Sequence, residues 1–222
     1  MSFISVFDVL GPNMIGPSSS HTAGAVRIGR IAGALLGETA VRAEIGLHGS
    51  FAKTYKGHGT DKALAAGIMG MEPSDDRIRQ SLVMAQEKGI HVSFYQTHID
   101  GAHPNTALIS LTGRSGKTVS LEGASIGGGN IRIRKVNGLE VEISGEATTF
   151  IILHNDTPGT IAAVTQFLAG QNINIGSFRL SRRQKGGLAV MTLEVDSSVS
   201  AQLNEELERL PNIISSTVLA PQ

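Results

Sequence analysis

Hydrophobic and polar residues alternate with two different periods along this chain, and the changes of period predict its helices and strands. Apolar residues at helical spacing run through 23–36, directly after several hydroxyl-bearing residues. A two-residue alternation over 40–47 predicts a strand. The same alternation returns over 132–143 around Asn137-Gly138, a pair typical of the tight turn in a β-hairpin.

The segment between these two regions mixes short helices, short strands and glycine-rich turns. Residues 56–59, Lys-Gly-His-Gly, are predicted to form a loop, after which Thr60 caps a short helix. Ser74 is predicted to open another helix that ends at Lys88-Gly89, because its first turn is acidic and its end is basic. Strands are predicted at 90–95, 107–111 and 118–122, with turns at 113–116 and 127–129.

The positions from 148 onward form a self-contained pattern. Strands are predicted at 148–154, 172–182, 188–195 and 212–219, and helices at 160–171 and 199–210. The order β-α-β-β-α-β is the ferredoxin-like arrangement. We therefore predict an α+β protein with a mixed α/β domain over residues 1–147, a linker at 145–147 and a ferredoxin-like βαββαβ domain over residues 148–222.

Composition narrows the classes of function. At 222 residues and 41% apolar, the chain is long enough to bury one large or two small cores. Its 19 basic residues balance 19 acidic residues and it has no tryptophan, which argues against nucleic-acid binding. No apolar run reaches the length of a membrane span and no signal-peptide pattern opens the chain, so we expect no membrane association and a cytoplasmic location.

The chain contains no cysteine. It therefore cannot form a disulfide, a thiol nucleophile or a thiolate metal site of its own. The remaining candidates for chemistry are hydroxyl, imidazole and carboxylate groups.

The sharpest chemical signal is the run Gly-Pro-Ser-Ser-Ser-His-Thr-Ala-Gly at 16–24, which leads into the first predicted helix. The N–H groups and the dipole at a helix start can hold a carboxylate or a phosphate. His21 lies in this turn and has the side-chain pKa nearest to neutrality. The alternative is an ordinary capped loop, because Ser and Thr commonly begin helices. The hydroxyls of the run belong to Ser18, Ser19, Ser20 and Thr22.

The C-terminal pattern resembles an ACT domain, a small ligand-binding module of amino-acid metabolism. The resemblance rests on Leu-His-Asn-Asp-Thr-Pro-Gly at 153–159 and Asn-Ile-Asn-Ile-Gly at 172–176. In ACT modules that bind amino acids, the ligand lies between the first strand–helix loop and the start of the second strand, usually where two modules pair. The resemblance implies self-association and an effector site, the alternative being a plain helix start at Pro158-Gly159. The implied effector-binding residues are Asn155, Gly159, Ile175 and Gly176.

The rest of the chain resembles the β chain of the bacterial iron–sulfur L-serine dehydratases. The resemblance rests on residues 5–12, 15–23, 57–63 and 100–105, and the glycine turn at 127–129 also fits. The family eliminates water and then ammonia from L-serine to give pyruvate, with a [4Fe-4S] cluster as Lewis acid on the departing hydroxyl. Cysteine thiolates normally hold such clusters. The resemblance therefore implies that a separate α subunit binds the cluster and that this chain is active only with that subunit.

The resemblance also implies roles for particular residues. His21 is the first candidate for the base that removes the α-proton of serine, and His103 is the other. The implied catalytic group is His21, Ser20, His103 and Asn105, and the implied substrate-binding group is Ser18, Ser19, Thr22, Gly127 and Gly128. We interpret His58 and Lys62 as structural or regulatory. We expect no metal site on this chain, because the other histidines do not have the sequence spacing that is typical of metal ligands.

Other functions are weighed against this one. The main alternative is a non-catalytic regulatory subunit that binds an amino acid through the ACT domain. A phosphate-handling enzyme is disfavoured because the P-loop spacing is absent. A transcriptional sensor is disfavoured because the chain is neutral overall and has no basic helix-turn-helix pattern.

Overall fold

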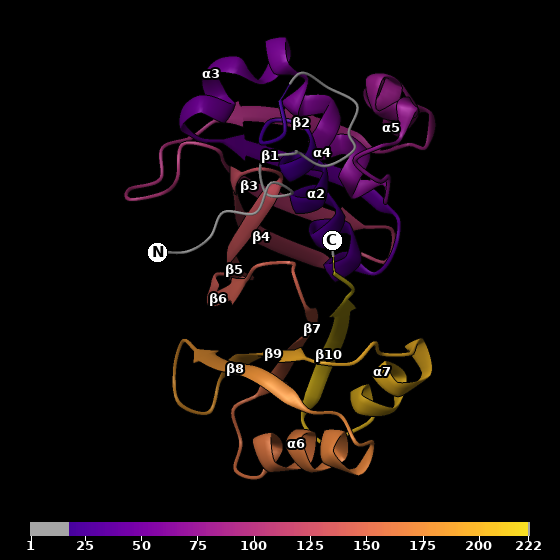
Figure 1. Cartoon of the computed structure of the whole chain (residues 1–222), viewed down its shortest axis with the longest axis vertical. Helices are drawn as coiled ribbons and strands as arrows, with labels where there is room; N and C mark the ends of the chain where they lie inside the picture. Colours follow the sequence, from indigo (N-terminus) through magenta and orange to yellow (C-terminus); the bar gives the residue numbers. More distant parts are fainter. Residues whose placement is uncertain (1–17, 222) are drawn as a thin grey trace. The chain divides into compact units, whose positions relative to one another are not determined.

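The computed structural model describes residues 18–221, which form two compact units (Figure 1). One unit ends at Asn137 and the other begins at Gly138. The domain boundary predicted at residue 147 stays a prediction. Three parts of the resemblance, residues 5–12, Ile15 and Gly16-Pro17, lie outside the described residues.

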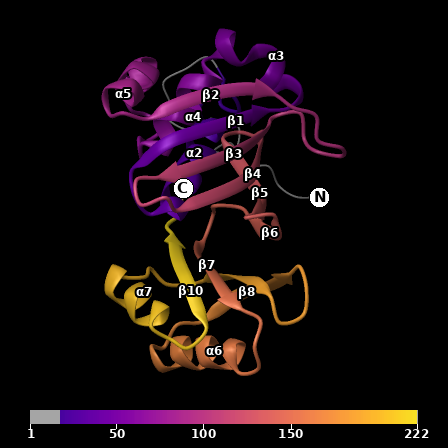
Figure 2. The same ribbon diagram turned by 180° about the vertical axis from the view of Figure 1, so that it is seen from behind.

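A mixed sheet with the strand order β2-β1-β3-β4-β5-β6 forms the framework of the N-terminal region. Strands β1 and β2 run parallel, whereas β3, β4 and β5 each pair antiparallel with the preceding neighbour in the sheet. Figure 2 shows β2, β1 and β3 side by side. The strands are β1 Ala40–Leu47, β2 His91–Gln96, β3 Thr106–Gly113, β4 Thr118–Gly127, β5 Asn130–Val136 and β6 Leu139–Ile143.

The helices of this unit connect β1 to β2 or precede β1, and α2 and α4 cover one face of the sheet (Figure 1). The predicted helix at 23–36 is confirmed as α2, which begins and ends at the expected residues. The helical segments are α2 Ala23–Leu36, α3 Gly49–His58, α4 Thr60–Ile68, the 3-10 helix η1 Asp76–Gln80 and α5 Ser81–Glu87.

Glycine allows α2 and α4 to approach each other closely. A Cβ atom built at Gly67 of α4 would lie 2.1 Å from the carbonyl oxygen of Val26, and one at Gly29 of α2 would lie 2.4 Å from that of Leu64. Both distances are below van der Waals contact, so any side chain at these two positions forces the helices apart. The fixed position of α2 matters because the serine–histidine run leads directly into this helix.

Three local predictions are wrong. The predicted loop at 56–59 belongs largely to α3, because the chain stays helical through His58 and turns left-handed only at Gly59 (φ 72°). Thr60 is not the cap of α4, because Gly59 occupies that position and the Thr60 hydroxyl is buried without a hydrogen-bond partner among the described residues. The helix predicted from Ser74 is divided into η1 and α5, and the Asp75 carboxylate caps η1 by accepting from the Arg77 N–H.

The hairpin predicted at Asn137-Gly138 is confirmed. Both residues have positive φ, 49° and 70°, as a two-residue turn between twisted strands requires. The preceding strand β4 runs five residues beyond its predicted end at Glu122, because Ala124 and Ser125 still pair with β5.

The C-terminal sheet has the order β10-β7-β9-β8, with antiparallel neighbours throughout. This order and the element sequence confirm the ferredoxin-like βαββαβ prediction. One core joins both helices to one face of the sheet, with Phe150, Val164, Leu168, Leu193 and Leu207 all fully buried. The elements are β7 Thr148–Asn155, α6 Thr160–Gly170, β8 Ile175–Arg182, β9 Leu188–Val195, α7 Ala201–Glu208 and β10 Ile213–Leu219.

The close helix pair gives a direct stability test. We expect Gly67→Ala to lower the free energy of unfolding by about 1–3 kcal/mol, because the new methyl group collides with the Val26 carbonyl. Gly57→Ala in α3 is the matched control, since a Cβ there has no neighbour within 4 Å and alanine favours a helix. Urea unfolding with unchanged m-values measures both. Equal stability of the two variants would contradict the packing argument.

Candidate functional site

The serine–histidine run forms a tight turn that continues directly into α2. The Thr22 N–H donates to the Ser18 carbonyl (2.9 Å) and the Gly24 N–H donates to the Ser19 carbonyl (3.0 Å). The prediction that the run precedes a helix is confirmed. These two N–H groups are nevertheless already paired within the chain. The anion-binding capacity of this turn therefore depends more on its hydroxyls than the sequence suggested.

His21 lies at the centre of the turn and is only 7% exposed. Its Nδ1 lies 3.3 Å from the Ser18 hydroxyl oxygen and 3.2 Å from that of Ser20. On the other side of the ring, Nε2 lies 3.3 Å from the hydroxyl of Ser50. Because a hydroxyl can donate or accept, these neighbours suit either tautomer of the neutral ring and also the charged imidazolium.

Two further rings enclose His21. Phe51 meets it edge-on at a centroid distance of 5.2 Å, and His58 lies at 4.7 Å with the ring planes nearly perpendicular. Burial lowers the pKa of His21 below its ordinary value of 6.5, and the nearby imidazole of His58 lowers it further. His21 is therefore neutral near pH 7, the state that a proton acceptor needs.

Ser50 is a site residue that the sequence analysis missed. It stands in the first turn of α3, where its N–H and that of Phe51 both donate to the Pro104 carbonyl, at 2.8 and 3.3 Å. Gly49 has φ 59°, and a Cβ atom there would lie 2.6 Å from the Pro104 oxygen. The loop at 103–105 thus holds the start of α3 in the place that brings Ser50 to His21. No local motif could reveal this contact, because the two residues are 29 positions apart.

His103 and Asn105 stabilise their own loop. The Asn105 N–H donates to Nδ1 of His103 (3.1 Å), and the Thr106 hydroxyl donates to the His103 carbonyl (2.6 Å). His103 is exposed, and within residues 18–221 neither His103 nor Asn105 hydrogen-bonds to His21 or to the serine run. The contact between this loop and His21 runs through Pro104 and Ser50.

The glycine turn after β4 is tied to α2. Gly127, Gly128 and Gly129 all have positive φ, and the Arg27 guanidinium donates to the Gly129 carbonyl (2.7 Å). Nearby on β4, the Ser125 hydroxyl lies against Gly24, where a Cβ atom would stand only 2.0 Å from the Ser125 oxygen. Direct contact of Gly127 and Gly128 with a substrate stays a prediction.

Two buried hydroxyls border the start of α2. The Thr22 and Ser125 side-chain oxygens have no hydrogen-bond partner among the described residues. A buried hydroxyl without a partner is costly. Both oxygens are enclosed by the protein, so a ligand could reach them only if the start of α2 opened.

The predicted effector residues lie at opposite ends of the C-terminal sheet. Asn155 is aligned with Leu188 of β9, whereas Ile175 is aligned with Val195 at the far end of the same strand. Gly159 caps α6 next to the Asn155 end with φ 88°, and Gly176 follows Ile175 in β8. One copy of the chain therefore does not bring the two pairs together.

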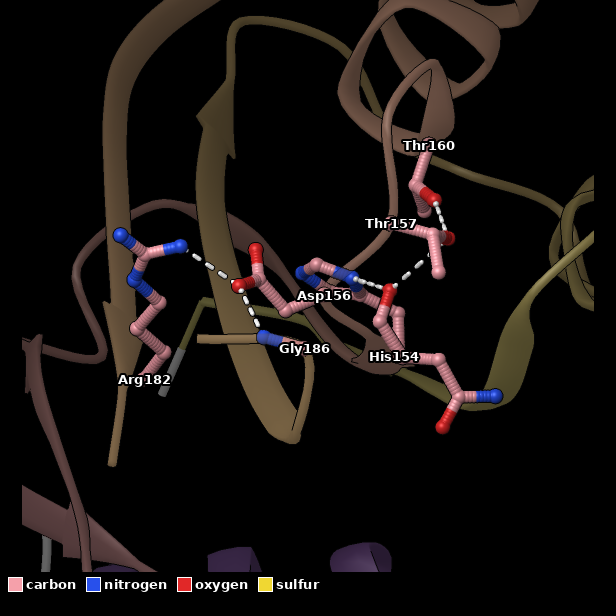
Figure 3. A network of polar contacts seen from close by, with 7 residues as sticks. His154, Asp156, Thr157, Thr160, Arg182 and Gly186 are labelled. Carbon is pink, nitrogen blue, oxygen red and sulfur yellow. Dashed lines mark hydrogen bonds and ion pairs between the residues drawn. The ribbon is translucent and has the colours of Figure 1, made fainter. Parts of the chain in front are cut away.

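A polar network orders the loop that follows β7 (Figure 3). The Asp156 carboxylate accepts from the Gly186 N–H (2.9 Å) and from Arg182 (2.5 Å), and these two donors lower the pKa of Asp156. Buried His154 donates from Nδ1 to the Asn155 carbonyl (2.9 Å), which fixes its tautomer because a carbonyl only accepts. The network ties the loop before α6 to the turn between β8 and β9.

In the part of the chain that the structure describes, no group of three or more His, Asp and Glu side chains is arranged to hold a metal ion. None of the helices between residues 18 and 221 is long and apolar enough to cross a membrane.

Comparison with known proteins finds relatives for both regions. A family model for the serine dehydratase β chain matches residues 5–89, and one for the ACT domain matches residues 148–212. The probable L-serine dehydratase β chain of Bacillus subtilis is 46% identical over 99% of this chain and 100% of its own length. The L-serine dehydratase β chain of Peptoniphilus asaccharolyticus is 38% identical over 93% and 94%. The L-serine dehydratase of Helicobacter pylori is 37% identical over 39% of this chain and 19% of its own length.

The environment of His21 predicts an unusual titration. We expect an NMR midpoint below 6.5, and a partial rise in His58→Gln, because burial contributes more to the lowered pKa than His58 does. Between the lowered pKa and 6.5 the folded chain binds fewer protons than the unfolded chain, so acidification through this window lowers the free energy of unfolding. His91→Gln on exposed β2 is the control. A midpoint at or above 6.5 would contradict the view that burial governs the pKa of His21.

Proposed function

Because the chain belongs to the serine dehydratase β-chain family, we propose that it works with a separate α subunit to convert L-serine to pyruvate and ammonia. We further propose that this chain binds the serine carboxylate and removes the α-proton. The observation that carries the proposal is the buried, neutral His21 between three hydroxyls. The two β-chain relatives match this chain over nearly their full length, which supports a subunit of a two-chain enzyme.

The serine run is suited to holding the substrate carboxylate. Ser18, Ser19 and Ser20 are half-buried and carry hydroxyls that can donate to an anion. The Thr22 hydroxyl, which has no partner within residues 18–221, lies at the same helix start, where the helix dipole also favours negative charge. Fixing the substrate in this way lowers the barrier by restricting its orientation.

His21 is suited to accepting the proton from the α-carbon. Its lowered pKa leaves one ring nitrogen with a free lone pair near pH 7. Once protonated, the ring donates from both nitrogens, to Ser50 on one side and to Ser18 or Ser20 on the other. The three hydroxyls therefore stabilise both charge states of His21 without a large rearrangement.

The residues of this chain do not fit an iron–sulfur cluster. The chain has no cysteine, and within residues 18–221 no cluster of other ligands is arranged for a metal. We therefore assign the [4Fe-4S] cluster, and the departure of the β-hydroxyl, to the α subunit. The isolated chain is then inactive.

The ACT domain fits a regulatory role. We propose that it binds an amino-acid effector between two copies, with Asn155 and Gly159 from one copy facing Ile175 and Gly176 from the other. The position of these pairs at opposite ends of one sheet supports a composite site. A chain with a purely regulatory function is the second candidate, and the substitution of His21 separates it from the first.

Substitution of His21 tests the proposed chemistry. We expect His21→Ala, combined with iron-loaded α subunit, to form pyruvate from L-serine at least about 100-fold more slowly than the native complex, because a general base is lost. His103→Ala should lose far less, since no hydrogen bond joins His103 to His21 within residues 18–221. His98→Ala is the exposed control. Co-purification with the α subunit verifies assembly, and normal turnover of the His21→Ala complex would eliminate His21 as the base.

Ser50 provides a second, independent test. We expect Ser50→Ala to reduce kcat about tenfold while leaving KM for L-serine nearly unchanged, because Ser50 orients His21 and does not hold the carboxylate. Ser50→Thr keeps the hydroxyl and should restore most of kcat. The backbone bond to Pro104 survives both changes. A rise in KM with unchanged kcat would instead place Ser50 against the substrate.

A further inference from the structure

A cavity of about 520 Å³ lies in the N-terminal unit and takes no part in the serine–histidine site. It is formed by α3, α4, α5 and β2, and its size is that of a small-molecule pocket. Its walls are divided by chemistry, with two opposite charges on one part and apolar side chains on another. The charged residues are Lys56 and Asp61, the apolar ones are Leu82, Ile90, Val92 and Phe94, and Tyr55, Gln86 and His91 complete the lining with further polar groups.

The Asp61 carboxylate is buried and uses only part of its hydrogen-bonding capacity. The residue is 9% exposed, and its Oδ1 accepts from the Lys62 N–H at 2.9 Å. The N–H of Asp61 itself also acts on the carboxylate, which makes no ion pair within residues 18–221. Burial raises the pKa of Asp61 in spite of the opposing influence of two lysines. A cation or a charged donor that enters the cavity would relieve this cost.

Lys56 supplies the opposite charge to the same cavity. Its ammonium lies 5.8 Å from the centre of the Tyr55 ring and is not within ion-pair distance of Asp61. Lys56 acts on Asp61 only as a more distant charge that lowers the Asp61 pKa. The cavity therefore presents an anion and a cation that do not neutralise each other directly.

Most of the remaining wall is apolar and comes from α5, β2 and the residue before β2, with Gln86 and His91 as the polar residues among them. Ile90 is buried, and Leu82, Val92 and Phe94 are half-buried, so each offers carbon surface to a ligand. Covering this surface with an aliphatic group removes it from water and favours binding. A polar ligand as small as serine would leave that surface exposed to water.

We propose that this cavity binds an α-amino acid with an apolar side chain. The ammonium group pairs with Asp61, the carboxylate pairs with Lys56, and the side chain lies against Leu82, Ile90 and Val92. This ligand matches all three chemical parts of the cavity at once. The site is separate from the serine–histidine turn and from the ACT domain, so it does not depend on the proposed reaction.

Methyl NMR of the full chain with L-leucine as the probe tests the location. We expect saturable shifts in the methyl signals of Leu82, Ile90 and Val92, with Ile175 and Leu188 of the C-terminal unit unchanged. Shifts confined to those two C-terminal residues would assign leucine binding to the ACT domain and overturn the proposal. The absence of any saturable shift at millimolar leucine would overturn it as well.

Two leucine analogues test the charges. 4-Methylpentanoate lacks the ammonium group and 3-methylbutylamine lacks the carboxylate, so each should bind at least about tenfold more weakly than L-leucine. Asp61→Asn should weaken L-leucine by a similar factor, while keeping an oxygen for the Lys62 N–H. Lys56→Met should weaken L-leucine but not 3-methylbutylamine, which has no carboxylate for Lys56.

The matched control is Lys53→Met, which removes an exposed lysine from the same helix outside the cavity. It should bind L-leucine with native affinity. If Asp61→Asn fails to fold, Lys56→Met still decides the question, because Lys56 is exposed. Native affinity in Lys56→Met, or equal weakening by Lys53→Met and Lys56→Met, would contradict the specific role of Lys56.

Discussion

Both ring nitrogens of the buried His21 imidazole lie within hydrogen-bonding distance of side-chain hydroxyls, and of hydroxyls alone. A carboxylate partner would raise the pKa of the ring and hold it charged. Hydroxyl partners allow the ring to stay neutral. When the ring gains a proton, the hydroxyl oxygens accept hydrogen bonds from both ring nitrogens. The surrounding helices and loop are placed so that this set of contacts closes around His21.

Close backbone packing makes that placement possible. Gly67 lets α4 approach α2, Gly24 lets α2 approach β4, and Gly49 lets α3 begin against Pro104. A side chain at each of these positions would collide with a different neighbour. All three glycines therefore fix the positions of elements that reach the site. The chemistry of His21 thus depends on residues that contribute no functional group.

The chain also presents three separate chemical environments. The serine–histidine turn surrounds an imidazole with hydroxyls, whereas the cavity near Asp61 has two opposite charges that form no ion pair within residues 18–221, next to apolar side chains. The loop after β7 is fixed by the Asp156 network at one end of the C-terminal sheet. The chain that carries these environments belongs to the family of L-serine dehydratase β chains.

The sequence by itself determined the features that depend on neighbours along the chain. The helix at 23–36, the Asn137-Gly138 turn and the βαββαβ order follow from hydrophobic period and local backbone preference, and the structure contains all three. Only the tertiary structure decided that Ser50, and not His103 or Asn105, contacts His21. It also decided that α3 continues through His58, next to His21. These contacts join residues that are far apart in sequence. They form because each element packs against distant elements, and local sequence patterns do not encode that packing.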